Sequence, residues 1–301
     1  KNATHPNDYF TSKSHPAVFA ADQIDLLKMI QLANDLDASA FPAIVQMHVL
    51  DENQPISGID DFTLSLTEKL FNTPAAIARV IRSSAHQKTM KIQVKSVNKN
   101  FKEKIQYKWV LLQGDADKVS IKRSTTDGST VEITSKWHTP FKPKSRNGAT
   151  SIRVEIAVFA VTDKSVSAPS FVTLLYPENQ KRDYSPQGKI LSIDHTYNAK
   201  RYVDPQVFAK RDWRDDYHYD TQGRLTGWSR TRGGKTTEFT YHGAQVVESD
   251  SEGRATKAQR VGYLYDRGAS GHLEAVEKPI NAYLAIEYLN KEDRRGIVTK
   301  Q

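Results

Sequence analysis

Aromatic and basic side chains gather in one short stretch of the chain, residues 211–234 (RDWRDDYHYDTQGRLTGWSRTRGG). Tryptophan and tyrosine rings stack on the apolar faces of sugars, and arginine forms two-point hydrogen bonds to carboxylate or sulfate groups. The same residue types can stack on bases and pair with phosphates in single-stranded nucleic acid. The candidate ligand-binding residues are Trp213, Arg214, Tyr217, Tyr219, Trp228, Arg230 and Arg232.

A second interpretation of this stretch is that its aromatic residues form the core of a small β-domain. Residues 200–240 contain few other large apolar side chains to bury. Tyr217 and Tyr219 would share one face of a strand, and Trp228, Arg230 and Arg232 one face of the next, because side chains alternate along a strand. One face of each strand must point inward, so only part of the set can meet a ligand. The sequence leaves open which face that is.

Four aspartates lie in the same stretch and could bind Ca²⁺, which takes six to eight oxygen ligands. They are Asp212, Asp215, Asp216 and Asp220. Their spacing is not that of a DxDxDG calcium loop, and arginines lie close enough to neutralise them. Turn caps and surface ion pairs are therefore the alternative to a calcium site.

Catalytic motifs are missing from the sequence. It contains no cysteine, so thiolate metal sites and cysteine nucleophiles are excluded. There is no HExxH, GxSxG, GxGxxG or Walker sequence. Two carboxylates could still hydrolyse a glycoside. We therefore expect binding rather than catalysis, and assign no catalytic residue and no firm cofactor. The alternative is part of a polysaccharide-degrading enzyme whose active site lies partly or wholly in another segment.

Length, charge and the first residues suggest a part of a larger exported protein. The 301 residues fit two or three domains, and no apolar run is long enough to span a membrane. The chain starts at Lys1 without methionine or a signal peptide, so we expect a processed fragment. Residues 1–71 carry 4 Lys/Arg against 10 Asp/Glu, and residues 72–180 carry 18 against 8. Such an acidic leader before a basic middle predicts either docking within the molecule or a polyanionic partner.

Hydrophobic periodicity predicts mostly strands. Apolar residues at helical spacing predict one amphipathic helix over 21–35, with Asp22 as its cap or first-turn acid. Residues 44–50 and 62–66 read as strands, and Thr73-Pro74 suggests a short helix over 74–82. From Thr89 to Tyr176 the period is two, which is typical of an antiparallel β-sandwich.

Part of this region resembles an immunoglobulin-like domain of the polycystic-kidney-disease (PKD) type. The resemblance covers 89–177 and rests on a Tyr107-x-Trp109 strand before the Gly114-Asp115 turn, and on a long strand ending at Thr162-Asp163. We expect Trp109 to be a core tryptophan between two sheets. The resemblance implies a spacer or accessory role in a secreted bacterial enzyme or surface protein.

Residues 184–268 carry a spaced pattern that resembles the tyrosine-aspartate (YD) repeats of bacterial Rhs-type surface proteins. The pattern has three copies, YSPQGKI (184–190), YDTQGRL (219–225) and DSEGR (250–254). In each copy a turn ends at a glycine, where positive φ is allowed, and a basic residue opens a strand. The physical content is a small meander of β-hairpins. The periodicity of residues 272–301 does not decide between helix and strand.

Together these features predict a mainly β protein with three segments. Residues 1–88 form a short acidic α/β segment, 89–178 an antiparallel Ig/PKD-like β-sandwich, and 179–301 a region of YD-repeat-like hairpins. The expected role is a non-catalytic accessory or surface-binding portion of a larger exported bacterial protein, secreted, periplasmic or on the cell surface. Its expected partner is a polysaccharide, including an anionic one, together with a catalytic domain or chain of the same precursor. The second alternative is a nucleic-acid-binding protein, favoured by the pI of about 9.3.

Overall fold

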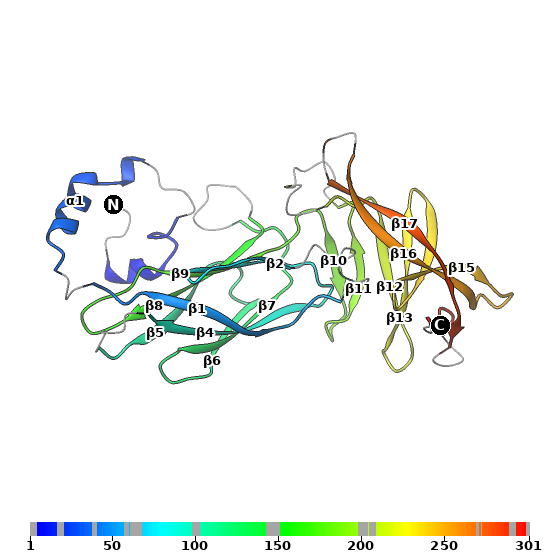
Figure 1. Cartoon of the computed structure of the whole chain (residues 1–301), viewed down its shortest axis with the longest axis horizontal. Helices are drawn as coiled ribbons and strands as arrows, with labels where there is room; N and C mark the ends of the chain where they lie inside the picture. Colours follow the sequence, from blue (N-terminus) through cyan, green and yellow to red (C-terminus); the bar gives the residue numbers. More distant parts are fainter. Residues whose placement is uncertain are drawn as a thin grey trace. The chain divides into compact units, whose positions relative to one another are not determined.

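Strands account for most of the regular structure, as the period-two pattern predicts (Figure 1). This computed structural model describes residues 5–16, 21–37, 41–56, 60, 68–97, 103–142, 151–197, 204, 209–268, 271, 273–288 and 293–298. The chain forms two compact units. Unit 1 comprises Lys1–Asn53, Lys69–Ile81 and Gln87–Tyr176, and unit 2 comprises Gln54–Glu68, Arg82–His86 and Pro177–Gln301.

Unit 1 contains two β-sheets. The four-stranded sheet has the order β1 (Val45–Glu52), β4 (Gln87–Ser96), β7 (Thr130–Lys136) and β6 (Val119–Arg123). The five-stranded sheet has the order β2 (Lys69–Asn72), β3 (Ala76–Val80), β9 (Ser170–Leu175), β8 (Arg153–Val161) and β5 (Gln106–Gln113). Strands β1 and β3, which come from the first 88 residues, are therefore built into the sheets formed by later residues.

The core of unit 1 comes from the alternating apolar residues of both sheets. Met90, Ile92 and Ile133 of one sheet are fully buried, as are Val154, Ile156, Val172 and Leu174 of the other. Burial on one face of each sheet confirms the mainly β, sandwich-like architecture. Trp109, expected to fill the core, is only half-buried, and its indole N–H donates to the Gly128 carbonyl at 2.9 Å.

The helix predicted over 74–82 is wrong, because these residues form strand β3. Its residues Ile77 to Val80 are buried, and the strand pairs in parallel with β9, from Ala76 opposite Phe171 to Val80 opposite Leu175. Burial between two neighbouring strands outweighs the local signal of Thr73-Pro74, which instead forms the turn between β2 and β3. The sheet is therefore mixed rather than purely antiparallel. The strand predicted over 62–66 lies outside the described residues.

The described residues before β1 include three short helices. Two 3-10 helices, η1 (Pro6–Phe10) and η2 (Ala21–Gln23), precede helix α1 (Leu26–Asn34). The predicted helix is confirmed, but Asp25 rather than Asp22 is its N-cap, and its carboxylate accepts from the Lys28 N–H at 3.1 Å. None of the described α1 residues is buried. None of the described helices is long and apolar enough to cross a membrane.

A buried arginine joins the strands at one side of unit 1. The Arg79 guanidinium on β3 donates to both oxygens of Glu52 on β1, at 2.8 Å each. It also donates to the Asn72 side chain at 2.8 Å, and Lys88 on β4 lies 3.0 Å from Glu52. Burial alone would raise the pKa of Glu52, but the hydrogen bonds and charges of Arg79 and Lys88 outweigh it and lower that pKa. The cluster thereby fastens β1 and β2 to their neighbours.

Unit 2 is an antiparallel meander in which strands follow one another in sequence order. Its eight strands are β10 (Lys181–Tyr184), β11 (Ile190–Asp194), β12 (Arg214–Tyr219), β13 (Leu225–Arg232), β14 (Lys235–Thr240), β15 (Ala244–Ser249), β16 (Ala255–Arg267) and β17 (Leu273–Leu284). The expected β-hairpin region is confirmed and continues beyond residue 268. The tail forms strands where it is described, β17 and then β18 (Ile286–Glu287) with β19 (Ile297–Val298).

The three repeated glycine turns have the same geometry. A side-chain oxygen of Ser185, Asp220 or Asp250 accepts from the backbone N–H groups two and four residues later, at 2.8 to 3.2 Å. The glycine between them has φ of +76 to +78° in each turn. Such values favour glycine because it lacks Cβ. The sequence spacing therefore marked three equivalent turns, including the first, where serine replaces aspartate.

Replacing Arg79 by alanine should lower the free energy of unfolding by up to about 3–5 kcal/mol, because the largely buried Glu52 carboxylate would lose its two-point partner and keep only Lys88. Urea denaturation followed by circular dichroism measures this change. Lys164→Ala is the control, since Lys164 is exposed and pairs with Glu103 at 3.4 Å. The control should change stability by about 1 kcal/mol or less. Equal effects of the two substitutions would contradict the assigned role of Arg79.

Candidate functional site

The stretch 211–234 forms the hairpin of β12 and β13 in the middle of the unit 2 meander. Tyr217 lies opposite Trp228, Asp215 opposite Arg230, and His218 opposite Gly227. On its other side β13 pairs with β14, with Trp228 opposite Phe239. The aromatic residues therefore sit on adjacent central strands, where one face must be covered.

Most of the predicted ligand-binding aromatics are buried. Trp213, Tyr217 and Trp228 are interior residues, and Trp228 stacks on Phe239 with ring centroids 5.4 Å apart. Tyr219 is partly buried, and its hydroxyl donates to the Ile190 carbonyl at 2.8 Å. The core interpretation thus accounts for these rings, and in this conformation the three interior ones have no surface on which a sugar could stack.

Arg230 is also buried and occupies the centre of a charged network. Its Nε and Nη2 donate to the two oxygens of Asp215 at 2.7 and 2.9 Å. Its Nη1 donates to the Tyr263 hydroxyl at 2.7 Å and to Glu277. The guanidinium carbon lies 4.3 Å from the centroid of the Trp213 ring, whose indole N–H donates to Asp215. Arg230 shares a strand face with Trp228, so the core interpretation of that face places both side chains inward.

The surroundings of this network keep Arg230 charged and leave Tyr263 and His195 neutral. Burial lowers the pKa of Arg230, but the adjacent Asp215 carboxylate outweighs it and raises that pKa, so the guanidinium stays charged. Burial raises the pKa of Tyr263 to about 12, so its hydroxyl stays neutral. Burial together with the positive charges of Arg211, Arg230 and Arg182 lowers the pKa of His195 well below its ordinary value. A neutral histidine therefore packs beside the Asp215–Arg230 pair.

The same contacts show that the sheet curves. Arg230 lies on β13, while Tyr263 and Glu277 lie on β16 and β17, which are three and four strands further along the order. In addition, Lys210 just before β12 forms a parallel bridge to Glu274, and the Ala275 N–H donates to the Lys210 carbonyl at 3.0 Å. A flat sheet could not bring these strands together, so β12 to β17 wrap around the core of Trp213, Tyr263 and Ala275.

A pocket of about 300 Å³ lies where β17 meets the segment before β12. We name it the cationic pocket, because three of its eight lining residues are basic. It is lined by Thr196, Lys210, Arg211, Asp212, Arg232, Glu274, Ala275 and Val276. The guanidinium carbons of Arg211 and Arg232 lie 5.9 and 5.8 Å from the Trp213 ring centroid, so this ring helps to hold both groups in place. The pocket can therefore offer several donors to one anionic group.

The four aspartates predicted as metal ligands do not converge on one point, because each pairs with a different arginine. Asp212 pairs with Arg232 at 2.8 Å, Asp215 with Arg230 at 2.7 Å, Asp216 with Arg214 at 2.7 Å and Asp220 with Arg224 at 2.8 Å. Asp220 also caps its turn. Across the described part of the chain, no three acidic or histidine side chains are gathered closely enough to hold a metal ion. The turn-cap and ion-pair interpretation accounts for their positions.

Of the predicted ligand-binding residues, Arg232 alone lines the cationic pocket. Arg214 is equally exposed, but it pairs with Asp216 away from that pocket. The sequence analysis did not predict Lys210 or Glu274 as site residues. They are 64 residues apart in the sequence, and a parallel β-bridge brings them together in the fold. The adjacent basic residues Lys210-Arg211, two positions before Trp213, were the one local sign of the pocket.

Comparisons with models of known protein families, with curated proteins and with solved structures find no match to this chain. The geometry of the described residues is therefore the basis for the functional argument.

Arg230→Ala should lower the free energy of unfolding by about 3–5 kcal/mol, because Asp215 would be left as a buried, unpaired carboxylate. Arg214→Ala is the matched control on the neighbouring strand, since it breaks an exposed pair and should cost about 1 kcal/mol or less. Urea denaturation measures both. If the two variants had similar stabilities, Arg230 would not be the buried centre of the network.

The stability of the protein should fall as the pH falls below about 6.5, where histidine in an unfolded chain takes up a proton. Buried His195 resists protonation in the folded state, so acid favours the unfolded chain, by up to about 1.4 kcal/mol per pH unit. His195→Asn should make the slope of unfolding free energy against pH less steep between pH 6.5 and 5. An unchanged slope in this variant would show that His195 does not make this contribution.

Proposed function

We propose that this chain is a non-catalytic, carbohydrate-binding accessory portion of a larger exported bacterial protein. In this proposal the cationic pocket of unit 2 holds an acidic group of an anionic polysaccharide. The resemblances of residues 89–177 to a PKD-type domain and of 184–268 to YD repeats support this setting, because both families occur in exported bacterial proteins. The observation that carries the proposal is the convergence of Lys210, Arg211 and Arg232 on one pocket.

The pocket suits a carboxylate or sulfate group attached to a hydroxyl-rich ring. Guanidinium and ammonium groups donate strong hydrogen bonds to such anions. Asp212 and Glu274, on the same walls, can accept hydrogen bonds from sugar hydroxyls. Three basic against two acidic residues leave the lining only weakly positive, which favours an acidic sugar over a bare, highly charged ion.

Burial of the hairpin aromatics changes how the ligand would be recognised. With Trp213 and Trp228 in the interior, affinity would come from hydrogen bonds and charge rather than from ring stacking. Trp213 would act from beneath, by holding Arg211 and Arg232 in position. A change in tryptophan fluorescence on binding that is absent from the Trp213→Phe variant would then report occupancy of the pocket.

The same pocket chemistry could receive a phosphate, so a nucleic acid is the competing ligand class. An active site for polysaccharide degradation, placed in another segment, would be compatible with the same binding role. Titrations with matched ligands separate the two binding alternatives.

An acidic oligosaccharide such as oligogalacturonate should bind more tightly than a neutral one, measured by isothermal titration calorimetry and by the intrinsic fluorescence of the four tryptophans. Arg211→Gln with Arg232→Gln should weaken binding by about 10–100-fold, since a hydrogen bond to a charged group contributes about 1.5–3 kcal/mol. A sulfated oligosaccharide tested in parallel shows which acidic group is preferred.

Arg214→Gln is the control, because this arginine is as exposed as Arg232 (44% against 43% of the side chain) and also pairs with an aspartate. It should leave affinity unchanged. Salt-sensitive binding of a single-stranded oligonucleotide, with no binding of any oligosaccharide, would show that the ligand is a nucleic acid and not a polysaccharide. Oligosaccharide binding that survives the double substitution would place the site elsewhere.

A further inference from the structure

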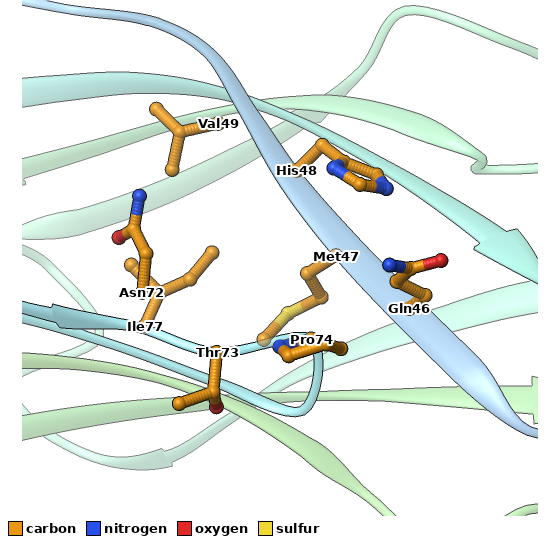
Figure 2. Close-up of a pocket in the computed structure, with 8 residues that line it drawn as sticks. All are labelled: Gln46, Met47, His48, Val49, Asn72, Thr73, Pro74 and Ile77. Carbon is orange, nitrogen blue, oxygen red and sulfur yellow. The ribbon is translucent and has the colours of Figure 1, made fainter.

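Unit 1 has a pocket of about 270 Å³ between strand β1 and the β2–β3 turn (Figure 2). Figure 2 shows Met47 directed from β1 toward Thr73 and Pro74 of that turn. The described residues that line the pocket include no Asp, Glu, Lys or Arg, and they are Gln46, Met47, His48, Val49, Asn72, Thr73, Pro74 and Ile77. The pocket is therefore an uncharged gap between two sheets. Unit 2 contains a different hollow, which is charged and which a side chain of the same chain fills.

This hollow is a notch at Gly227 on strand β13. Gly227 lies opposite His218 on β12. A Cβ atom at position 227 would lie 2.6 Å from Cδ of Arg295, so the missing side chain leaves the space that this arginine occupies. Arg295 Nε donates to the Glu238 carboxylate at 2.7 Å, and Nη2 donates to the Ser229 hydroxyl at 3.4 Å. The notch therefore holds a guanidinium group that comes from near the end of the described chain.

Arg295 belongs to a short segment, Asp293–Val298, here named the arm. The buried Asp293 carboxylate accepts a hydrogen bond from the Arg295 N–H at 3.0 Å. The Ala255 N–H at the start of β16 donates to the Arg294 carbonyl at 2.6 Å, and β19 of the arm pairs with β18. The arm thus contacts β16 and β18 through its backbone, and the Arg295 side chain connects it to β13 and β14.

A chain of hydrogen bonds leads from Arg295 to a histidine. The Ser229 hydroxyl donates to Glu238 at 2.7 Å and lies 2.6 Å from Nε2 of His218. Because Ser229 gives its one proton to Glu238, Nε2 of a neutral His218 must carry the hydrogen that is donated to Ser229. Acid would then add the second proton at Nδ1. These four side chains link β12, β13, β14 and the arm.

The surroundings of His218 oppose its protonation while the arm is in place. The described charged groups that act on it are Asp216 on its own strand, Glu238 on β14 and Arg295 of the arm, whereas β13 contributes a serine hydroxyl. Burial, followed by the charge of Arg295, lowers the pKa of His218, against the opposing effect of the two acids. Asp216 is already paired with Arg214, and Glu238 with Arg295. A protonated His218 would therefore need a carboxylate that Arg295 now holds.

We propose that His218 and Arg295 compete as the cationic partner of Glu238, so that the arm is closed while His218 is neutral and is released when acid protonates it. Release leaves Glu238 to the protonated His218, with Ser229 between them. Because closure lowers the pKa of His218, proton uptake favours the open arm. The arm therefore stays closed above about pH 6.5, the ordinary pKa of histidine, and opens as the pH falls below it. This proposal is independent of polysaccharide binding by the cationic pocket.

Double electron–electron resonance between two spin labels tests the proposal, and the absence of native cysteine allows specific labelling. Arg294→Cys places one label on an exposed position of the arm, and Thr236→Cys places the other on an exposed position of β14. At pH 7.5 the labels should give one narrow distance distribution. From pH 6.5 to 5.5 the ratio of a second, longer population to the first should rise by up to about tenfold, the limit for one proton taken up on opening.

Two variants of the labelled protein identify the groups, and a third is the control. His218→Gln keeps a hydrogen-bond donor for Ser229 but cannot be protonated, so its arm should stay closed at both pH 7.5 and pH 5.5. Arg295→Gln removes the guanidinium and should open the arm at both. His242→Gln, the control, changes an exposed histidine of the same meander and should leave the pH response of the labelled parent unchanged.

Each of three results would overturn the proposal. The labelled parent could give the same distances at pH 7.5 and pH 5.5. The His218→Gln protein could open in acid like its parent, which would assign the response to another group such as His195. The Arg295→Gln protein could stay as closed as its parent at both pH values.

Hydrogen exchange of the Ala255 N–H, which donates to the Arg294 carbonyl, replaces the distance measurement if circular dichroism shows that a labelled protein does not fold. In the unlabelled chain, acid should reduce the protection of this N–H in wild type and not in His218→Gln. Equal protection of the wild type at both pH values would likewise overturn the proposal.

Discussion

The guanidinium of Arg230 is a full charge in the interior of unit 2, and the arrangement of the meander depends on keeping it paired. Its partners come from β12, β16 and β17, so the strands must wrap around it. Trp213 lies against its face, and the guanidinium carbons of Arg211 and Arg232 lie 5.9 and 5.8 Å from the centroid of the same ring. The buried charge of Arg230 and the cationic pocket are therefore connected through the Trp213 side chain.

Unit 1 also contains a buried arginine that is paired with a carboxylate. Arg79 is as deeply buried as Arg230 and is also paired with a carboxylate through two nitrogens. A buried pair of this kind contributes little net stability compared with apolar packing, but it tolerates few alternative arrangements. In each unit the arginine is joined both to the preceding strand and to strands further away in the sequence, which specifies how those strands meet.

Features set by neighbouring residues could be predicted from the sequence, whereas features set by distant ones could not. Period-two alternation located the strands between 89 and 176, and the glycine spacing located three equivalent turns. The prediction failed at Ile77 to Val80, where a parallel partner almost a hundred residues away decides the structure. At the candidate site, local reasoning put Arg230 among the ligand-binding residues, because Tyr263 and Glu277, which join Asp215 around its guanidinium, are 33 and 47 residues distant. Lys210 escaped notice for the same reason.

The path of the chain between the units has an evolutionary consequence. Segments Gln54–Glu68 and Arg82–His86 leave unit 1 to join unit 2, where the Glu68 carboxylate accepts from the Ser83 N–H and Arg182 donates to the Ser83 carbonyl. A single recombination point after Tyr176 would therefore strip the meander of these segments. Exchange of one unit by recombination at that single point would therefore leave unit 2 incomplete.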